Sequence, residues 1–540
     1  MKILPISFKY RFKAFFLLLI LLNVCLSCAS ESDFYQTLQE LNDSLIEDVL
    51  EEQNSEEEID DNSDETEEEE LPADDTSTND DESEPIENFI YSENVFYVSV
   101  DGQSSNSGKT EQEPWSVEHA FRTAKAKDTI FIKAGNYGNV DLLVTNSGNS
   151  EGGIFFIGYF QFPLDVISNG AATVSYEDYK QNNDSFDTNI LPTFIGNRTN
   201  DIGLGSAIRM FDKDYIHLEN LQVQYYKSNI VNRGGEYCVF KNIITTDAGD
   251  FYIENSDKDG NSGFNMTGQG LTIDDGDYNV VRDCLAINCG MRGVIVENGS
   301  EYTEHYNNKV YSDNGINATD YYYLISSNSS HAILDNIYVE RAEGMHHIAH
   351  GICLKDGANN NIVRNCTVVN TRIELSFDDV TENLVEDSIV IGRDEHVGCI
   401  SVANGAHHNT FKNVTVEKAA GGVKFEDWID GDGDGASNAG HHNEFINCTF
   451  KGMEYGVAFY FWDVIYTEAF DNTFTNCSFE NLEVLFQINR PNRNTIFESC
   501  NFENISDLIN SRSKNGLYPD FELDAKFYNS TTSNLGFTLP

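Results

Sequence analysis

The chain has 540 residues, long enough for one very large domain or several of ordinary size. Gly, Asn, Thr, Val, Ile and Phe are plentiful and there are only 9 prolines, which favours β structure with many tight turns. The formal net charge of −55 makes the chain a poor candidate for nucleic-acid binding.

Residues 1–28 have the pattern of a signal peptide. A short apolar core from Phe15 to Leu22 is too brief for a comfortable membrane span. The basic residues before it are Lys2, Lys9, Arg11 and Lys13. The sequence CLSC that follows resembles a bacterial lipobox, although Cys25 stands where leucine is usual. That resemblance implies lipidation of Cys28 and an outer-membrane lipoprotein facing the surface or the periplasm. An ordinary signal peptide cut nearby is the alternative.

Residues 29–90 are predicted to form an acidic, disordered tether. Residues 31–90 hold 26 Asp and Glu and no Lys or Arg, so the segment repels itself and stays extended. After residue 90 the chain keeps 63 acidic and 30 basic residues, a net charge of −33. The tether would hold this folded body, residues 91–540, away from a membrane that it reaches only through the lipid.

The segment from Phe96 to Gly138 opens the folded part. It predicts a strand, a Gly/Ser turn, a helix near Ser116–Ala126 and then a second strand. Beyond it, one short phrase recurs, as in RDCLAI, RNCTVV, INCTF and TNCSF. Its aligned positions are Leu221, Ile243, Cys284, Ile337, Cys366, Ser388, Val414, Cys448, Cys477 and Cys500. Several steps are 22 or 23 residues, and the others are longer because of insertions.

A period near 22 residues with short β runs and Asn/Gly turns indicates a solenoid in which each repeat is one coil. The nine cysteines after the signal form no C-x-x-C pair, so they are predicted to be small buried hydrophobes stacked on their equivalents. The chain resembles the right-handed parallel β-helix proteins. We therefore expect an all-β fold, a single right-handed parallel β-helix with an N-terminal helical cap.

A second strand precedes each recurring phrase, as in GLTIDDG, GVIVENG, GICLKDG and CISVANG. Alternate residues of these strands face inward, and the outward residues of successive coils form columns. One column contains Asp274, Glu297, Ser326, Lys355, Ser376, Ala403 and Glu426. Another contains Thr272, Ile295, Cys353, Glu374, Ser401 and Lys424, with Arg292, His350 and Arg372 at the leading edge. A solvated, charge-balanced face is the plain interpretation, and a functional face the sharper one.

An elongated face on a β-helix suits an extended polymer, and two reactions fit these residues. In β-elimination a base removes the proton α to a uronate carboxyl group, a cation stabilises the enolate and an acid assists the leaving oxygen. In hydrolysis two carboxylates flank the bond. The candidates for that pair are Glu374, Asp378, Asp379, Glu426 and Asp427.

The phrase ICLKDGANNNIVRNCTVVNTRIEL resembles alginate lyases and chondroitinase-B-like lyases. Those enzymes place a catalytic lysine at the end of one coil strand, where this chain has Lys355, and an arginine one coil on, where this chain has LSFDD. The resemblance implies a lyase acting on an acidic polysaccharide or its oligosaccharides, such as alginate or ulvan. The expected catalytic residues are Lys355, His350, Arg372 and Glu297. The expected substrate-binding residues are Arg292, Tyr322, His346, His347, Glu374 and Glu426.

Two roles remain open for the catalytic pair. Either Lys355 is the base and His350 or Tyr322 donates to the leaving oxygen, or His350 is the base and Lys355 steadies the enolate. A glycoside hydrolase of the same fold and a non-catalytic glycan-binding protein are the alternatives. We expect a monomer whose partner is an acidic glycan and that binds no nucleic acid.

The sequence DGDGDG supplies Asp430, Asp432 and Asp434 at alternate positions. Alternate carboxylates resemble the first half of a calcium loop, although His441 stands where its last ligand, a glutamate, is expected. We therefore expect Ca²⁺ there, against a plain acidic loop as the alternative. The pairs His407–His408 and His441–His442 replace NN at one turn, which indicates turn stacking rather than a metal site.

Overall fold

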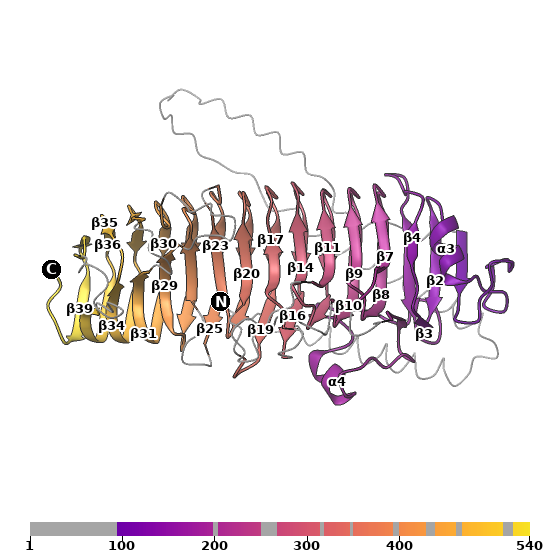
Figure 1. The fold of residues 1–540 in the computed structure, drawn as a ribbon, viewed down its shortest axis with the longest axis horizontal. Coiled ribbons are helices and arrows are strands. Elements are labelled where there is room, and N and C mark those ends of the chain that lie inside the picture. The colour runs from indigo at the N-terminus through magenta and orange to yellow at the C-terminus, as the bar shows by residue number, and fades with distance from the viewer. Residues whose placement is uncertain are drawn as a thin grey trace, which may run out of the picture. The chain divides into compact units, whose positions relative to one another are not determined.

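The computed structural model describes residues 94–197, 203–249, 267–313, 318–345, 349–377, 379–392, 399–427, 438–460, 467–510 and 522–540. The chain divides into two units, Met1–Ser83 and Glu84–Pro540, and all described residues belong to the second. In that unit 37 strands form one continuous parallel sheet that winds into stacked coils (Figure 1). The predicted parallel β-helix is thus confirmed.

Each coil contributes to three faces. Face A consists of β4 (Leu142–Val144), β7 (Ser206–Phe211), β9 (Ser228–Arg233), β11 (Gln269–Asp274), β14 (Arg292–Glu297), β17 (Tyr321–Ile325), β20 (His350–Lys355), β23 (Arg372–Ser376), β26 (Cys399–Ala403) and β29 (Gly421–Glu426). It continues through the second halves of three long strands, β31 (Thr449–Phe459), β34 (Ser478–Ile488) and β37 (Asn501–Asn510).

Face B follows face A along each coil. It consists of β1 (Asn94–Val98), β2 (Asp128–Lys133), β5 (Ile154–Tyr159), β12 (Val280–Arg282), β15 (Glu304–Tyr306), β18 (Ile333–Asp335), β21 (Ile362–Arg364), β24 (Leu384–Glu386), β27 (Thr410–Lys412), β30 (Glu444–Ile446), β33 (Thr473–Thr475), β36 (Thr495–Glu498) and β38 (Ala525–Tyr528). The first halves of β8 (Ile216–Gln224) and β10 (Val239–Thr246) belong to the same face.

Face C completes the coil. It consists of β3 (Gly135–Gly138), β6 (Pro192–Ile195), β13 (Leu285–Ile287), β16 (Lys309–Ser312), β19 (Tyr338–Arg341), β22 (Thr367–Val369), β25 (Ile389–Ile391), β28 (Thr415–Glu417) and β39 (Thr531–Leu535). The second halves of β8 and β10 and the first halves of β31, β34 and β37 extend it. A separate two-stranded sheet joins β32 (Ala469–Phe470) to β35 (Asn492–Arg493).

The bend between faces B and C explains the recurring phrase. A single residue turns the chain there in the left-handed region, and asparagine holds this position in many coils, as at Asn365, Asn413 and Asn447 with φ near +55°. Asparagine tolerates that conformation better than most residues. The next residue points inward, and the cysteines there are buried and stacked as predicted, with Cys448, Cys477 and Cys500 on successive coils. All nine described cysteines are free thiols.

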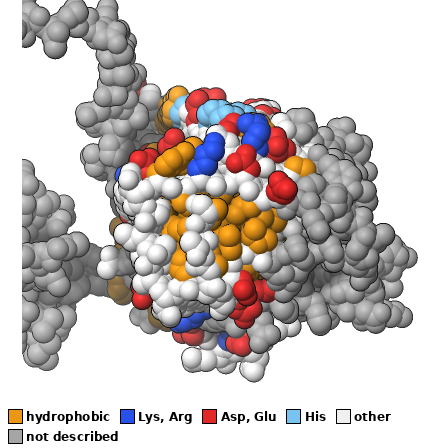
Figure 2. All heavy atoms as spheres, turned by 90° about the vertical axis from the view of Figure 1, so that its left-hand side faces the viewer, with side chains coloured by type: hydrophobic (Ala, Val, Ile, Leu, Met, Phe, Trp, Pro, Cys, Tyr) orange, Lys and Arg blue, Asp and Glu red, His pale blue; other side chains and the backbone are white. Residues whose placement is uncertain are grey.

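Helix α3 (Val117–Thr123) lies at the N-terminal end of the coils, where the sequence predicted it (Figure 1). The Ser116 side chain caps it, and Phe121 packs into the core against Phe156, with ring centroids 4.0 Å apart. The other described helix, α4 (Tyr176–Gln181), sits in an insertion whose apolar side chains pack on the outside of face C. At the opposite end, apolar side chains of the last coils reach the surface (Figure 2).

Among the described helices, none is long and apolar enough to cross a bilayer.

Candidate active site

The candidate site lies on the outer side of face A, over β17, β20, β23, β26 and β29. The register places Glu374 between Cys353 and Ser401, with Lys424 one coil further. Along the predicted column that contains Lys355, this lysine pairs in register with Ser376, followed by Ala403 and Glu426. The residues predicted to face inward are in the core, namely Ile352, Leu354, Ile373, Leu375, Ile400, Val402, Val423 and Phe425.

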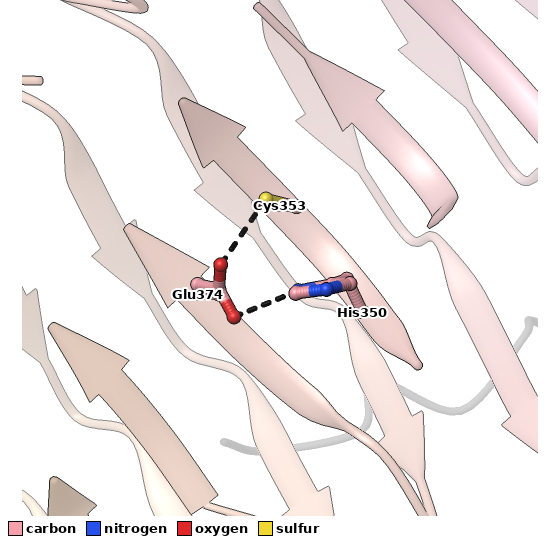
Figure 3. Close-up of side chains that lie close together, drawn as sticks. All are labelled: His350, Cys353 and Glu374. Atoms are coloured by element: carbon pink, nitrogen blue, oxygen red, sulfur yellow. Dashed lines mark hydrogen bonds and ion pairs between the residues drawn. The ribbon is translucent and has the colours of Figure 1, made fainter. Parts of the chain in front are cut away.

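Glu374 is the centre of the polar cluster, and its side chain is only 1% exposed. Its Oε2 lies 2.8 Å from Nδ1 of His350 and 2.7 Å from Nε of Arg372. The Ser376 hydroxyl donates to Oε1 at 3.2 Å. His350 and Glu374 come from the neighbouring strands β20 and β23 and point toward one another (Figure 3). Alternation on each strand therefore brings the histidine, the carboxylate and the arginine together.

This contact with Glu374 favours one tautomer of His350. An ionised carboxylate only accepts hydrogen bonds, so Nδ1 carries the proton and Nε2 keeps a lone pair. Nη2 of Arg372 lies 3.0 Å from Nδ1 and 3.4 Å from Nε2, so a positive charge lies beside the ring. The arrangement resembles an oriented general base.

The ion pairs continue along the face to Glu426, which is fully buried. Its Oε1 lies 3.6 Å from Nη1 of Arg372, and its Oε2 lies 3.6 Å from Nζ of Lys424. The Ser401 hydroxyl donates to Oε1 at 2.6 Å. Two carboxylates and two cations thus form one chain of alternating charge across β23, β26 and β29.

The neighbouring cations keep both acids ionised. Burial alone would raise the pKa of Glu374, but the charge of Arg372 and the hydrogen bonds from His350 and Ser376 outweigh it and lower the pKa to about 2. Burial also opposes ionisation of Glu426, yet Lys424 and Arg372 lower its pKa. Burial disfavours the charge of Lys424, but Glu426 raises its pKa above the ordinary value. Both glutamates are therefore ionised in the folded protein, where their role is structural.

This finding corrects the expectation that Glu374 and Glu426 touch a substrate. Both carboxylates are buried behind their cation partners, and their oxygens contact His350, Arg372, Lys424 and serine hydroxyls. Outward strand positions are accessible only where nothing covers the sheet, a condition that periodicity does not report. Their role here is to position and charge the side chains above them.

Lys355 lies at the other end of β20, with its side chain 18% exposed. Its Nζ lies 5.5 Å from the ring centroid of Tyr321 and 5.0 Å from that of Phe377, both cation–π contacts. Asp356 Oδ2 is 3.4 Å away. His350, on the opposite side of the site, contacts the same tyrosine. Its ring stacks on that of Tyr321 with centroids 4.5 Å apart and an interplanar angle of 9°. Tyr321 therefore links the histidine to the lysine.

The sequence-based choice of Tyr322 was wrong. Tyr322 is fully buried in the core, and the outward tyrosine is Tyr321. Strict alternation fails at this strand start, because the positions of Gly293, Tyr322 and Gly351 all lie at an inward-facing corner. A Cβ built on Gly293 would lie 2.7 Å from Cγ1 of core Val310. Tyr323 also faces inward, so two consecutive tyrosines are buried.

Glu297 and Arg292 lie on β14, two coils before His350. They pair with each other, Nη1 of Arg292 lying 3.2 Å from Oε2 of Glu297. Burial, as the larger effect, and nearby Asp274 raise the pKa of Glu297 despite Arg292. In the preceding coil Arg233 pairs with Asp274. The same outer column therefore carries a second, smaller set of ion pairs.

His350, Cys353 and Glu374 are close enough to hold a metal ion, since their ligand atoms lie within 4.8 Å of one another (Figure 3). The donor set fits a metal poorly. Arg372 already places a guanidinium 2.7 Å from the carboxylate oxygen that a cation would need. Burial raises the pKa of the Cys353 thiol well above its ordinary value, whereas a thiol ligand must be deprotonated. We therefore describe these residues as an ion-paired polar site.

Several predicted residues lie outside the described residues. They are Cys28, His346, His347, Asp378, Asp430, Asp432 and Asp434. The lipid anchor and the calcium loop stay predictions. Asp427 is described, and its carboxylate is buried against Thr467 and Arg490.

No protein-family model matches the chain, and no curated protein matches it. Solved structures resemble it only distantly. The catalytic domain of a GH87 alpha-1,3-glucanase in complex with tetrasaccharides has 11% identity and a TM-score of 0.43 over 76% of this chain and 64% of that one. The alignment thus covers less than two thirds of the glucanase domain.

Two lyases are also among the similar structures. A mannuronic acid specific polysaccharide family 6 lyase from human gut microbiota has 12% identity and a TM-score of 0.42, over 80% of this chain and 86% of that one. An alginate lyase from Paenibacillus sp. str. FPU-7 has 11% identity and a TM-score of 0.31, over 70% and 95%. At such scores the likeness identifies neither a substrate nor a reaction.

Proposed function

We propose that the protein is a carbohydrate-active enzyme that cleaves a uronate-containing polysaccharide, or its oligosaccharides, by β-elimination on the outer side of face A. This proposal rests on the arrangement of charge on this face, with buried acids beneath partly exposed cations. The acids Glu374 and Glu426 are at most 1% exposed, whereas the side chains of Lys355, Arg372 and Lys424 keep 15–20% of their surface exposed.

This layering favours an anionic ligand. The body of the chain carries a net charge of −33 beyond residue 90, which repels polyanions in general. On this patch the ends of Lys355, Arg372 and Lys424 reach the surface while Glu374 and Glu426 lie beneath them, and one exposed acid, Asp356, lies beside Lys355. A uronate carboxylate can therefore bind where most of the protein would exclude it. A neutral polymer would gain nothing from that charge.

The geometry supports one assignment of the catalytic roles. His350, with Nδ1 hydrogen-bonded to Glu374, presents Nε2 as the base for the proton α to the carboxylate. Lys355 supplies positive charge for the enolate. The C–H bond breaks, a carbon–carbon double bond forms as the C–O bond breaks, and the leaving oxygen takes a proton from the His350 imidazolium. The sequence left open whether Lys355 or His350 is the base. The assignment to His350 uses a base that is already oriented by a carboxylate.

Hydrolysis needs different carboxylates. A hydrolase requires one carboxylic acid that keeps its proton near the working pH, and that acid must reach the glycosidic oxygen. Glu374 and Glu426 are buried and have lowered pKa values, so neither fits that role. This argues against Glu374 and Glu426 as the acid of a hydrolase, whereas exposed Asp379, and Glu297, whose pKa is raised, stay available for that role.

The test is to incubate the purified protein with alginate, ulvan, pectin and glycosaminoglycans and to follow ultraviolet absorbance and reducing ends together. Elimination creates a conjugated double bond, so both signals should rise in step on at least one polymer. New reducing ends without absorbance would establish the hydrolase alternative. Binding to a polymer column with neither signal would establish a glycan-binding protein instead.

The cellular setting remains part of the proposal. We propose that Cys28 carries the lipid, that the acidic tether spaces the enzyme from the outer membrane, and that the chain acts as a monomer. A Ca²⁺ ion at Asp430, Asp432 and Asp434 would be a bound cofactor, structural or near the substrate carboxylate.

A further inference from the structure

Four histidines form a cluster at the bend between faces A and B that the proposed reaction does not use. His407 and His408 follow β26, and His441 and His442 occupy the equivalent positions one coil later. The rings stack coil on coil, His407 on His441 at 4.9 Å and His408 on His442 at 5.0 Å. Figure 2 shows histidine side chains grouped at the upper edge of the molecule, beside acidic and basic side chains.

Within each coil the two imidazoles meet through the same kind of atom. Nδ1 of His407 lies 2.7 Å from Nδ1 of His408, and Nδ1 of His441 lies 2.8 Å from Nδ1 of His442. The rings of each pair are nearly perpendicular, at 83° and 82°. Two Nδ1 atoms at this distance either share one proton in an N–H···N hydrogen bond or can bind one cation, and Nδ1 of His407 also lies 3.4 Å from Oγ1 of Thr381.

The spacing is compatible with one coordination geometry more than with another. Imidazole nitrogens bind divalent metals at about 2.0 Å, so two ligands at right angles lie about 2.8 Å apart and two at a tetrahedral angle about 3.3 Å apart. The observed 2.7 and 2.8 Å match the right angle. Square-planar or tetragonal nitrogen sites are characteristic of Cu(II) and Ni(II), and Cu(II) binds most tightly in the divalent series.

We propose that this histidine quartet is a binding site for a divalent transition metal with right-angled coordination, Cu(II) first and Ni(II) second, chelated through the Nδ1 atoms of one pair. The stacked pairs are 4.9–5.0 Å apart between ring centroids, so ions on both would repel each other. One tight ion and a weaker second are the expected stoichiometry.

The chain itself supplies the test variants, because the preceding coils carry other residues at these turn positions. Asn360 holds the position of His408 with φ +55°, against +54° for His408 and +53° for His442. The double variant His408→Asn/His442→Asn therefore keeps the backbone and leaves one imidazole per coil. His331→Asn is the matched control, since His331 lies in the same column beside Ser330 rather than beside a second histidine.

The experiment is a Cu(II) titration of the full chain at neutral pH, followed by calorimetry and by electron paramagnetic resonance. We expect a tight site with two equatorial nitrogens, weakened about tenfold or more in the double variant, because the second ligand of a chelate binds intramolecularly. Cu(II) should also raise the melting temperature of the wild type more than that of the double variant.

Carboxylates elsewhere in the chain give the same background in every variant, so the comparison isolates the quartet. His331→Asn should behave as the wild type. Equal affinity in wild type and double variant, or a spectrum without two nitrogens, would mean that each pair shares only a proton and would overturn the proposal. Equal loss in His331→Asn would do the same, since it would place the ion elsewhere.

Discussion

Tyr321 and Tyr322 are neighbours in sequence and lie on opposite sides of the wall of the β-helix. Tyr321 stacks on His350 and lies under the ammonium group of Lys355, whereas Tyr322 is fully buried. One substitution at each position therefore separates function from stability.

Tyr322→Ala should lower the free energy of unfolding by about 3–5 kcal/mol, as for other large buried aromatic side chains. Tyr321→Leu should leave stability within about 1 kcal/mol, since it replaces one partly exposed apolar surface by another. Urea unfolding and turnover of both variants measure this difference. Tyr321→Leu should lose activity because His350 and Lys355 both lose their contact. If Tyr321→Leu lost stability and Tyr322→Ala kept stability but lost activity, the assignment of Tyr321 to the site would be wrong.

Glu374 gives a pH test of the ion-paired cluster. Its pKa is about 2 in the folded protein against an ordinary value of 4.5. Its stabilising contribution, about 3 kcal/mol by linkage, is therefore fully present above pH 4.5 and is lost as the pH falls from there toward 2.

Glu374→Gln should unfold more easily than the wild type near neutral pH, and the gap should narrow below pH 4.5. Unfolding free energies of the two proteins at neutral pH and at about pH 3 measure it. Glu386→Gln, on face B beside Lys412, is the control, because a surface ion pair contributes little. A gap that stays constant with pH would show that Glu374 is not ionised against Arg372.

For single residues, the sequence predicts which side chains share an outward column better than it predicts which of them are exposed to solvent. Alternation correctly placed Lys355, His350 and Arg372 outside the core and in neighbouring coils. It could not show that Glu374 and Glu426 are covered, because burial depends on what lies over the sheet. Tyr322 was expected in a loop, but the run of three tyrosines belongs to β17, where Tyr322 lies at an inward-facing corner. The stacking of Tyr321 with His350 carried no sequence signal beyond the run of three tyrosines.

Among the elements, an asparagine ladder inside the bend between faces A and B holds successive coils in register. Asn361, Asn383, Asn409, Asn443 and Asn472 are at most 1% exposed, and each amide meets the next at 2.9–3.2 Å. Asn409 also donates to the carbonyl of Val380 at 3.0 Å and accepts from the backbone N–H of Asn383.

Asn409→Leu has nearly the same size but cannot make these hydrogen bonds. It should cost about 2–4 kcal/mol, because buried backbone groups lose their partners. Asn413→Gly, at an exposed left-handed position with φ +54°, should cost far less. Urea unfolding of both variants measures the contrast. Similar small losses would mean that backbone pairing alone sets the register.

The Asp430, Asp432 and Asp434 loop follows β29 and lies outside the described residues. If it binds Ca²⁺, calcium should raise the melting temperature by a few degrees over a chelator-treated sample, because the ion binds only the folded state. The variant with all three aspartates changed to asparagine should lose the shift. A chelated protein that melts where the calcium-loaded one does would leave a plain acidic loop.

The sequence repeat made it possible to predict that each coil contains the same kinds of strand and turn. Each coil repeats its turn and its small buried residue, so the phrase around Cys366 or Cys448 reveals the fold without any one strand being strong. The insertions do not repeat, and for that reason the sequence does not predict their structure. The helix at Val117–Thr123 was predictable from its local signal, with Ser116 as its cap.

For the whole molecule, substrate binding depends on the contrast between the acidic body and the patch of cationic ends over β20, β23 and β29. A polyanionic substrate should bind there through charge, and added salt should weaken its binding. The domain organisation stays a prediction, with residues 29–90 as tether and 91–540 as the folded body.

The most direct measurement is the rate at which wild-type protein and Lys355→Ala form ultraviolet-absorbing product from the acidic polymer that the wild type cleaves best. We expect the variant to melt as the wild type does and to lose turnover by about 10² or more, the scale of a lost charge-stabilising group. The matched control Lys412→Ala, on face B, should retain full turnover. A folded Lys355→Ala protein with near-full turnover, or a wild type that yields no such product from any uronate polymer, would contradict the account.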